Sequence, residues 1–182
     1  WTSKNKKEGI KIMNIKRIVK ISMFAVITYI AGLFQLPLGP VPITMQTAIV
    51  NISALVLSPI DALLAMIIHL VLKLLLNGVG IITMPSFGFL IGFAIASLLG
   101  SLFFSKSEKT KKDFIIAILI TAITPYILGL PYMAHVLNNI NGANMNIIQI
   151  MKAGFLIFIP GDLIKAFISY LIGVRIRPAL NN

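Results

Sequence analysis

Long apolar runs recur along the whole chain, and they constrain its fold more than any other feature. The runs have about 17 to 25 residues, the length at which an α-helix crosses the hydrocarbon core of a bilayer. Short stretches rich in Gly, Pro, Asn or Lys separate them. Hydrophobic residues make up 58% of the chain and charged residues 12%, against about 25% charged residues in soluble domains. The sequence therefore predicts an all-α membrane protein.

The runs and their breaks predict six transmembrane helices in one bundle. The break between the second and third is the least distinct, although Pro59 suits a helix start and Asp61 its first turn. Residues 1–15 are expected to form a basic N-terminal tail, residues 16–177 the six-helix transmembrane domain, and residues 178–182 a C-terminal tail. The predicted helices run from about Lys16 to Leu36, Thr44 to Leu57, Pro59 to Leu76, Pro85 to Phe104, Phe114 to Tyr132 and Asn146 to Val174.

The basic residues predict which end of the bundle faces the cytoplasm. Six crossings bring both termini to one side, and the connections assigned to the other side, near residues 37–42, 77–84 and 133–145, contain no Lys or Arg. Because basic loops stay in the cytoplasm, we predict cytoplasmic termini. Anionic lipid and this insertion bias explain the net charge of +11 without a nucleic-acid partner. Thirteen of the 16 basic residues lie on the predicted cytoplasmic face: Lys4, Lys6, Lys7, Lys11, Lys16, Arg17, Lys20, Lys106, Lys109, Lys111, Lys112, Arg175 and Arg177.

Five ionisable residues lie in or beside the predicted helices, where a charge is costly without a partner. Asp61 is expected at a helix start on the cytoplasmic edge, and Lys73 and Lys152 are expected to extend toward the lipid headgroups. Asp162 and Lys165 differ from these three. About thirteen residues, or roughly 20 Å of helix, separate Asp162 from the basic C-terminal end of the helix. The pair is therefore expected deep in the outer half of the membrane.

The i, i+3 spacing of Asp162 and Lys165 puts both side chains on one helical face. Pro160 and Gly161 interrupt helical hydrogen bonding beside them, and broken backbone persists at membrane depth only where protein or a cavity satisfies it. Two interpretations stay open: a structural ion pair, or a ligand site lined by both groups. Asn77 also has two interpretations, a ligand contact through its amide or the end of a helix beside glycine.

Three segments carry a specific combination of residues: PGDLIKA at 160–166, GPVPITMQT at 39–47 and GLPY at 129–132. Together they resemble BioY, the biotin-specific S component of energy-coupling-factor transporters, over nearly the whole chain. The resemblance implies a substrate-binding domain of six helices in a prokaryotic cell membrane, with biotin bound near the outer face. It also implies partner subunits, a transmembrane coupling protein and two cytoplasmic ATPases.

The resemblance further implies a set of substrate-binding residues. Asp162 and Lys165 are carried over by position, Asn77 matches a family asparagine, and Gln46 and Tyr132 come from the two other segments. Biotin offers N–H donors and a carbonyl on its ureido ring and a carboxylate on its tail, so an acceptor, a cation and an amide suit it. Which protein group meets the ring and which meets the tail stays open.

The chain departs from the family pattern at two places. The region between the third and fourth helices is shorter than usual and contains no arginine, so no such residue is available there to contact a ligand. The pattern of small residues by which the first helix packs on the coupling protein is imperfect. Ser22 is followed four residues later by Val26, whereas Thr28 and Gly32 offer a close-packing face one turn on.

Other functions have less support in the residues. Without cysteine, and with five carboxylates and two separated histidines, the chain offers no catalytic cluster or metal site, and we expect neither enzyme activity nor a cofactor. His69 is expected to be hydrogen-bonded within the bundle. No GxxxxGK[ST] loop is present, so ATP hydrolysis is expected from partner chains. The alternatives are an S component for riboflavin or thiamine, an ion-coupled permease and a membrane-embedded enzyme.

Overall fold

A computed structural model describes residues 15–180 of the chain. Residues 1–14, which make up most of the predicted basic tail and include four of its lysines, lie outside the described residues. In chain order the elements are α1 (Ile15–Ala31), β1 (Gln35–Leu36), β2 (Ile43–Thr44), α2 (Gln46–Val56), α3 (Pro59–Asn77), the 3-10 helix η1 (Val79–Thr83), α4 (Phe87–Lys106), α5 (Lys111–His135), the π-helix η2 (Val136–Ile140), α6 (Ile147–Gly154), the 3-10 helix η3 (Leu156–Phe158) and α7 (Ile159–Leu180).

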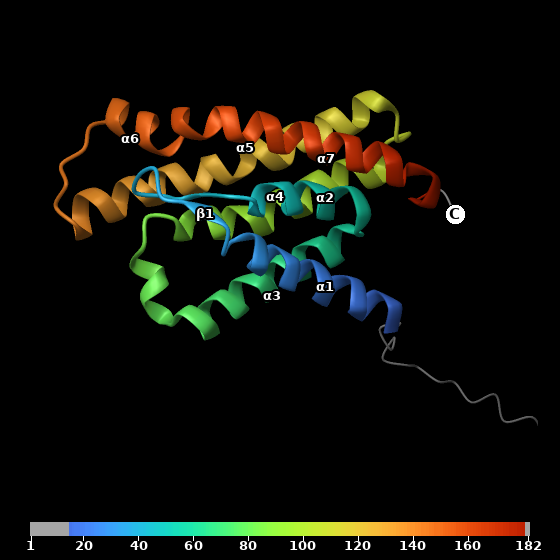
Figure 1. The fold of residues 1–182 in the computed structure, drawn as a ribbon, viewed down its shortest axis with the longest axis horizontal. Coiled ribbons are helices and arrows are strands. Elements are labelled where there is room, and N and C mark those ends of the chain that lie inside the picture. The colour runs from blue at the N-terminus through green and yellow to red at the C-terminus, as the bar shows by residue number, and fades with distance from the viewer. Residues whose placement is uncertain (1–14, 181–182) are drawn as a thin grey trace, which may run out of the picture.

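The helices run side by side along the longest axis of the molecule, and α4 packs against α2, α3 and α5 near the centre (Figure 1). The start of α1, the α2–α3 turn, the α4–α5 connection and the end of α7 lie at one end, on the right in Figure 1. The β1–β2 hairpin, η1 and the connection between η2 and α6 lie at the other end. The bundle thus has a terminal end and a hairpin end.

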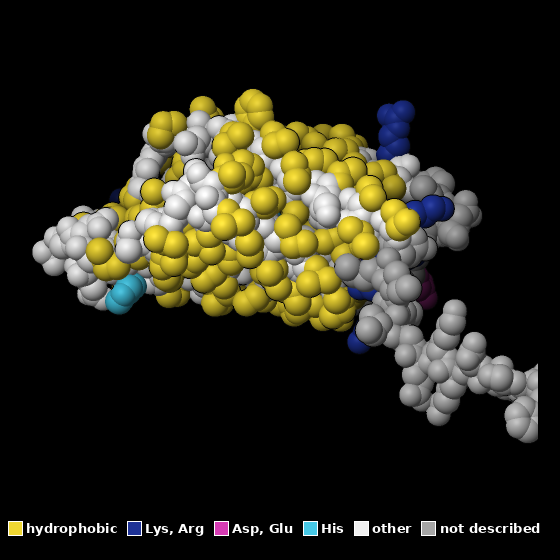
Figure 2. Space-filling model, turned by 90° about the horizontal axis from the view of Figure 1, so that it is seen from below, with side chains coloured by type: hydrophobic (Ala, Val, Ile, Leu, Met, Phe, Trp, Pro, Cys, Tyr) yellow, Lys and Arg dark blue, Asp and Glu magenta, His cyan; other side chains and the backbone are white. Residues whose placement is uncertain are grey.

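Within residues 15–180, four helical segments are long and apolar enough to cross a membrane: Pro59–Asn77, Phe87–Lys106, Lys111–Ile140 and Ile147–Ile176. The two other segments predicted to cross are shorter, with 17 described residues in α1 and 11 in α2. Figure 2 shows hydrophobic side chains over the middle of one face of the molecule and Lys and Arg side chains gathered at its right end, the terminal end. An apolar belt with basic residues at one end is the surface of a membrane protein.

The first predicted helix is wrong at its C-terminal end, because α1 stops at Ala31 instead of continuing to Leu36. Gln35 and Leu36 instead form β1, which pairs antiparallel with β2. A residue before proline avoids the helical conformation, and Leu36 precedes Pro37. The prolines at 37, 40 and 42 exclude a helix from the loop that joins the two strands.

The fifth predicted helix starts too late, and the sixth is not one continuous helix in the structure. α5 begins at Lys111, three residues earlier than predicted, because Thr110 and Asp113 form a capping box at its start. The predicted sixth helix is broken into α6, η3 and α7, and α7 continues past Val174 into the predicted C-terminal tail. The backbone of Phe155, at φ −130° and ψ −61°, ends α6.

Small residues allow α4 and α5 to pack closely, as in many membrane helix pairs. A Cβ atom added at Gly92 would lie 2.7 Å from the Cα atom of Pro125, and one at Gly100 would overlap the Thr121 side chain. These positions require glycine because a larger residue would push the two helices apart.

The close-packing face predicted at Thr28 and Gly32 of α1 is not on the outside of the bundle. Thr28 is fully buried and donates to the carbonyl oxygen of Phe24, 2.7 Å away. A Cβ atom at Gly32 would lie 2.7 Å from the Nε2 atom of Gln46. Both residues pack inward, so this part of the prediction is wrong, and the exposed face of α1 carries large aliphatic side chains such as Val26.

Candidate ligand-binding site

A pocket lies near the hairpin end, between the β1–β2 hairpin and helices α2, α3, α4, α5 and α7. Its walls are largely apolar, with a few polar groups that converge on the cavity, as in sites for small organic ligands. The lining residues on the hairpin and α2 are Gln35, Val41, Pro42, Thr44, Gln46 and Thr47, and those on the other elements are Lys73, Ser86, Phe89, Leu90, Phe93, Ala122, Pro125, Tyr126, Phe158, Asp162 and Lys165.

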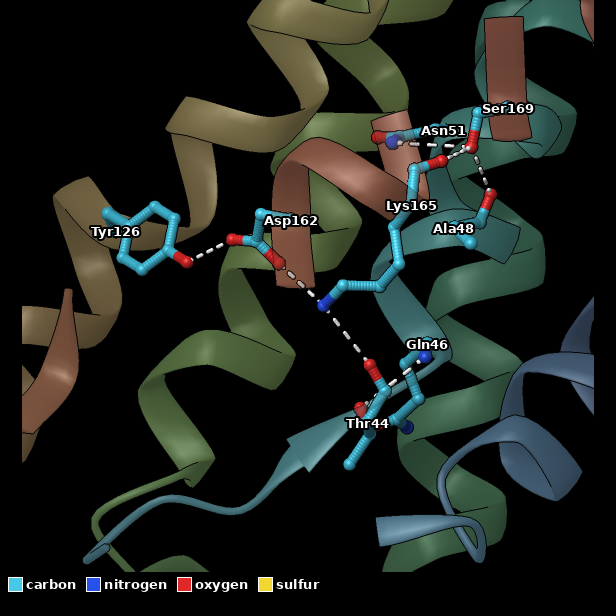
Figure 3. Close-up of polar contacts among 8 residues, drawn as sticks. All are labelled: Thr44, Gln46, Ala48, Asn51, Tyr126, Asp162, Lys165 and Ser169. Atoms are coloured by element: carbon cyan, nitrogen blue, oxygen red, sulfur yellow. Dashed lines mark hydrogen bonds and ion pairs between the residues drawn. The ribbon is translucent and has the colours of Figure 1, made fainter. Parts of the chain in front are cut away.

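Asp162 and Lys165 face each other at this pocket (Figure 3). The Nζ atom of Lys165 lies 2.5 Å from the Oδ1 atom of Asp162, and the two side chains are 4% and 14% exposed respectively. The ammonium group also donates to the carbonyl oxygen of Thr44 at 3.2 Å. The pair is therefore an ion pair, as one interpretation held, and it also lines a cavity, as the other held.

The break before α7 explains how the pair comes to face the pocket. The chain leaves α6 at Phe155, forms one turn of 3-10 helix and then starts α7 at Ile159. Pro160 lies in the first turn of α7, where its missing N–H leaves no intrahelical bond unmade. The helix is interrupted as predicted, but over residues 155–158 and not at Pro160 and Gly161, which lie inside the first turn of α7. Asp162 thereby falls in the first turn of α7, where the helix dipole stabilises a carboxylate.

Tyr126 of α5 is a polar residue of the site that sequence reasoning missed. Its hydroxyl donates to the Oδ2 atom of Asp162 (Figure 3). The ring packs edge-on against Phe89 and Phe155, at centroid distances of 5.7 Å and 5.0 Å. A tyrosine inside an apolar helix needs a hydrogen-bond partner, and this need was the one signal in the sequence that Tyr126 faces a polar group. Its partner lies 36 residues away, so no sequence spacing could identify it.

Gln46 begins α2 at the wall of the pocket and is 3% exposed. Its Oε1 atom accepts from the Thr44 hydroxyl at 3.1 Å, and its Nε2 atom lies 3.0 Å from the Nε2 atom of His69. The prediction that His69 is hydrogen-bonded within the bundle is thus confirmed. These bonds fix the orientation of the Gln46 amide relative to Lys165, whose ammonium contacts the backbone of Thr44.

Lys73 lies on α3 one turn after His69 and lines the same pocket. The sequence predicted a side chain that extends to the lipid headgroups. The structure instead places it half-buried at the cavity, with Phe89 and Asp162 among the other lining residues.

Asn77 and Tyr132 are not brought together with the other candidates. Asn77 is exposed at the last position of α3, where its Oδ1 atom accepts from the Tyr29 hydroxyl at 3.4 Å. Gly78 follows with φ +81° and ends the helix, the structural alternative considered for Asn77. The Tyr132 hydroxyl donates to the carbonyl oxygen of Ile82, outside the pocket lining. The structure therefore gathers Asp162, Lys165 and Gln46 at one pocket, and leaves two candidates elsewhere.

The solved structure of an S-component for biotin from an ECF-type ABC transporter, at 2.1 Å, has the same fold. The two chains superpose with a TM-score of 0.78 over 90% of this chain and 92% of the other, at 23% sequence identity.

Comparisons of sequence identify the family. A protein of Bacillus subtilis named "Probable biotin transporter BioY" is 33% identical over 172 residues, which cover 88% of this chain and 87% of that protein. The "Biotin transporter BioY" of Thermotoga maritima is 25% identical over 171 residues, 90% of this chain and 96% of that protein. Both relatives are transporters rather than enzymes. The BioY family model matches residues 4–182, and this chain therefore belongs to the BioY family.

Proposed function

We propose that this chain is the biotin-binding S subunit of an energy-coupling-factor importer and that biotin binds in the pocket beside α7. The observation that carries the proposal is the side-by-side carboxylate and ammonium of Asp162 and Lys165 at the wall of an apolar cavity. The names of the relatives, all biotin transporters, support the choice of ligand.

The chemistry of the pair suits the ureido ring of biotin. A cyclic urea presents an N–H donor next to a carbonyl acceptor, and the pocket offers a carboxylate acceptor next to an ammonium donor. Tyr126 holds the Asp162 carboxylate through its other oxygen, so the acceptor stays oriented when the ligand enters. The aromatic walls, with Phe89 and Phe158, suit the apolar thiophane ring.

The same proposal includes six membrane crossings with cytoplasmic termini. α2 has 11 residues, about 16 Å of helix, so it spans the bilayer only together with the hairpin that precedes it. The basic residues near the described ends of the chain and in the α4–α5 connection lie at the terminal end, and the connections at the hairpin end carry none. The pocket beside the hairpin then opens toward the outside, where an importer captures its cargo.

The sequence contains no GxxxxGK[ST] loop, so an ATP-driven import step would take its ATP hydrolysis from partner chains. We propose that a transmembrane coupling protein and two cytoplasmic ATPase subunits supply this step in a prokaryotic cell membrane. Transport of biotin by this chain alone in vesicles would favour the ion-coupled permease instead.

Calorimetry on the purified protein tests the choice of ligand. We expect tight binding of biotin and none of riboflavin or thiamine at matched concentrations. Preferential binding of either other vitamin would identify a sibling subunit, and the absence of biotin binding would overturn the proposal.

A further inference from the structure

The charges that line the pocket do not balance. The lining includes one carboxylate, on Asp162, and two ammonium groups, on Lys165 and Lys73. Asp162 and Lys165 neutralise each other at 2.5 Å. The pocket therefore keeps one net positive charge, and that charge belongs to Lys73.

No carboxylate within residues 15–180 forms an ion pair with Lys73. Asp61 pairs with Arg17 at the terminal end, 2.5 Å away, and Asp113 belongs to the capping box of α5. A half-buried ammonium at a largely apolar cavity is costly without an anion, so an anionic guest gains from it.

Lys73 and the pair also come from different sides of the site. Lys73 belongs to α3 and the pair to α7, and these two helices lie on opposite sides of α2 and α4 (Figure 1). A ligand in the pocket can therefore meet the neutral pair at one end and a lone cation at the other. Biotin has this asymmetry, with an uncharged ring system and a carboxylate at the end of its tail.

We infer that Lys73 binds the carboxylate of the ligand and so selects for an anionic tail. The inference rests on the proposed function, and it divides the roles among the three charged groups: the pair binds the ring, and Lys73 binds the tail. Lysine supplies a single charge on a flexible stem, which can follow a flexible tail.

The test compares biotin with biotinamide, which has the same rings and an uncharged tail. In calorimetric titrations of the purified protein, the wild type should bind biotin at least tenfold more tightly than biotinamide. Lys73→Ala should lose that preference by binding biotin at least tenfold more weakly while its affinity for biotinamide stays unchanged. Lys73→Arg keeps the charge and should keep the preference.

Lys152→Ala is the matched control, since Lys152 is an exposed lysine on α6 outside the pocket lining, and it should change neither titration. Thermal unfolding of each variant checks its folding, and Lys73→Gln serves as a second variant. If Lys73→Ala keeps the preference for biotin, or loses affinity for both ligands equally, the role of Lys73 is wrong while the proposed function still stands. A wild type that binds neither ligand would overturn the proposed function as well.

Discussion

The Asp162–Lys165 ion pair permits an experiment that separates a structural role from a ligand-binding role. Three variants are needed: Asp162→Asn, Lys165→Met and the double variant. In Asp162→Asn an ammonium group that is 4% exposed loses its counter-charge, and breaking a buried pair in this way costs about 3 to 5 kcal/mol. In Lys165→Met the carboxylate is 14% exposed and keeps its bond from Tyr126, so we expect a smaller loss, about 1 to 3 kcal/mol.

The double variant has no charge at the pair, and replacing both partners of a buried pair is often neutral for stability. We therefore expect it to recover most of the free energy of unfolding that Asp162→Asn loses. Biotin affinity should behave differently and stay at least tenfold, or about 1.4 kcal/mol, below the wild type in all three variants. Stability would be followed by thermal unfolding in detergent, and affinity by calorimetry.

Asp61→Asn provides the control, because it breaks a different ion pair, with Arg17, at the terminal end of the bundle. It should lower stability and leave biotin affinity unchanged. A double variant that is stable and binds biotin as tightly as the wild type would show that the pair is only structural and would refute the reasoning.

Two further predictions concern packing and topology. Gly92→Val should lower stability by about 1 to 3 kcal/mol, because a Cβ atom there lies 2.7 Å from the backbone of Pro125. Gly80→Val should leave stability unchanged, because nothing lies within 4 Å of its Cβ position. Equal thermal unfolding of the two variants would contradict the packing account. The chain has no cysteine, so single cysteines report topology: in intact cells an impermeant thiol reagent should label Leu38→Cys in the hairpin loop and spare Ser107→Cys, and the reverse pattern would invert the proposed orientation.

Helix positions were predictable where an apolar run met a strong start or stop signal. Pro59 and Asn77 bound α3 within one residue of the prediction, because a proline start and a glycine end are local signals. The end of α1 was mispredicted, since residues 32–34 form a turn and residues 35–36 pair with β2, a contact that the apolar run does not signal. The break at Phe155 was placed a few residues too late. Pro160 signalled an interruption there, but proline is tolerated in the first turn of a helix.

Spacing predicted the site only where its residues lie close in sequence, whereas Gln46 was identified through the family resemblance. Asp162 and Lys165 share a helical turn, so their joint position followed from spacing. Tyr126 and Lys73 reach the pocket from two other helices, and their positions depend on how the bundle packs. Asn77 was a site candidate because of its amide and its match to a family asparagine, yet the end of α3 carries it out of the pocket lining.

The most direct test of the account is an experimental structure of the purified protein with biotin. It should show the ureido ring within hydrogen-bond distance of the Asp162 and Lys165 side chains, in the pocket between the hairpin and α7. Biotin bound at another surface, with this pocket unchanged and the two side chains still bonded to each other, would contradict the account.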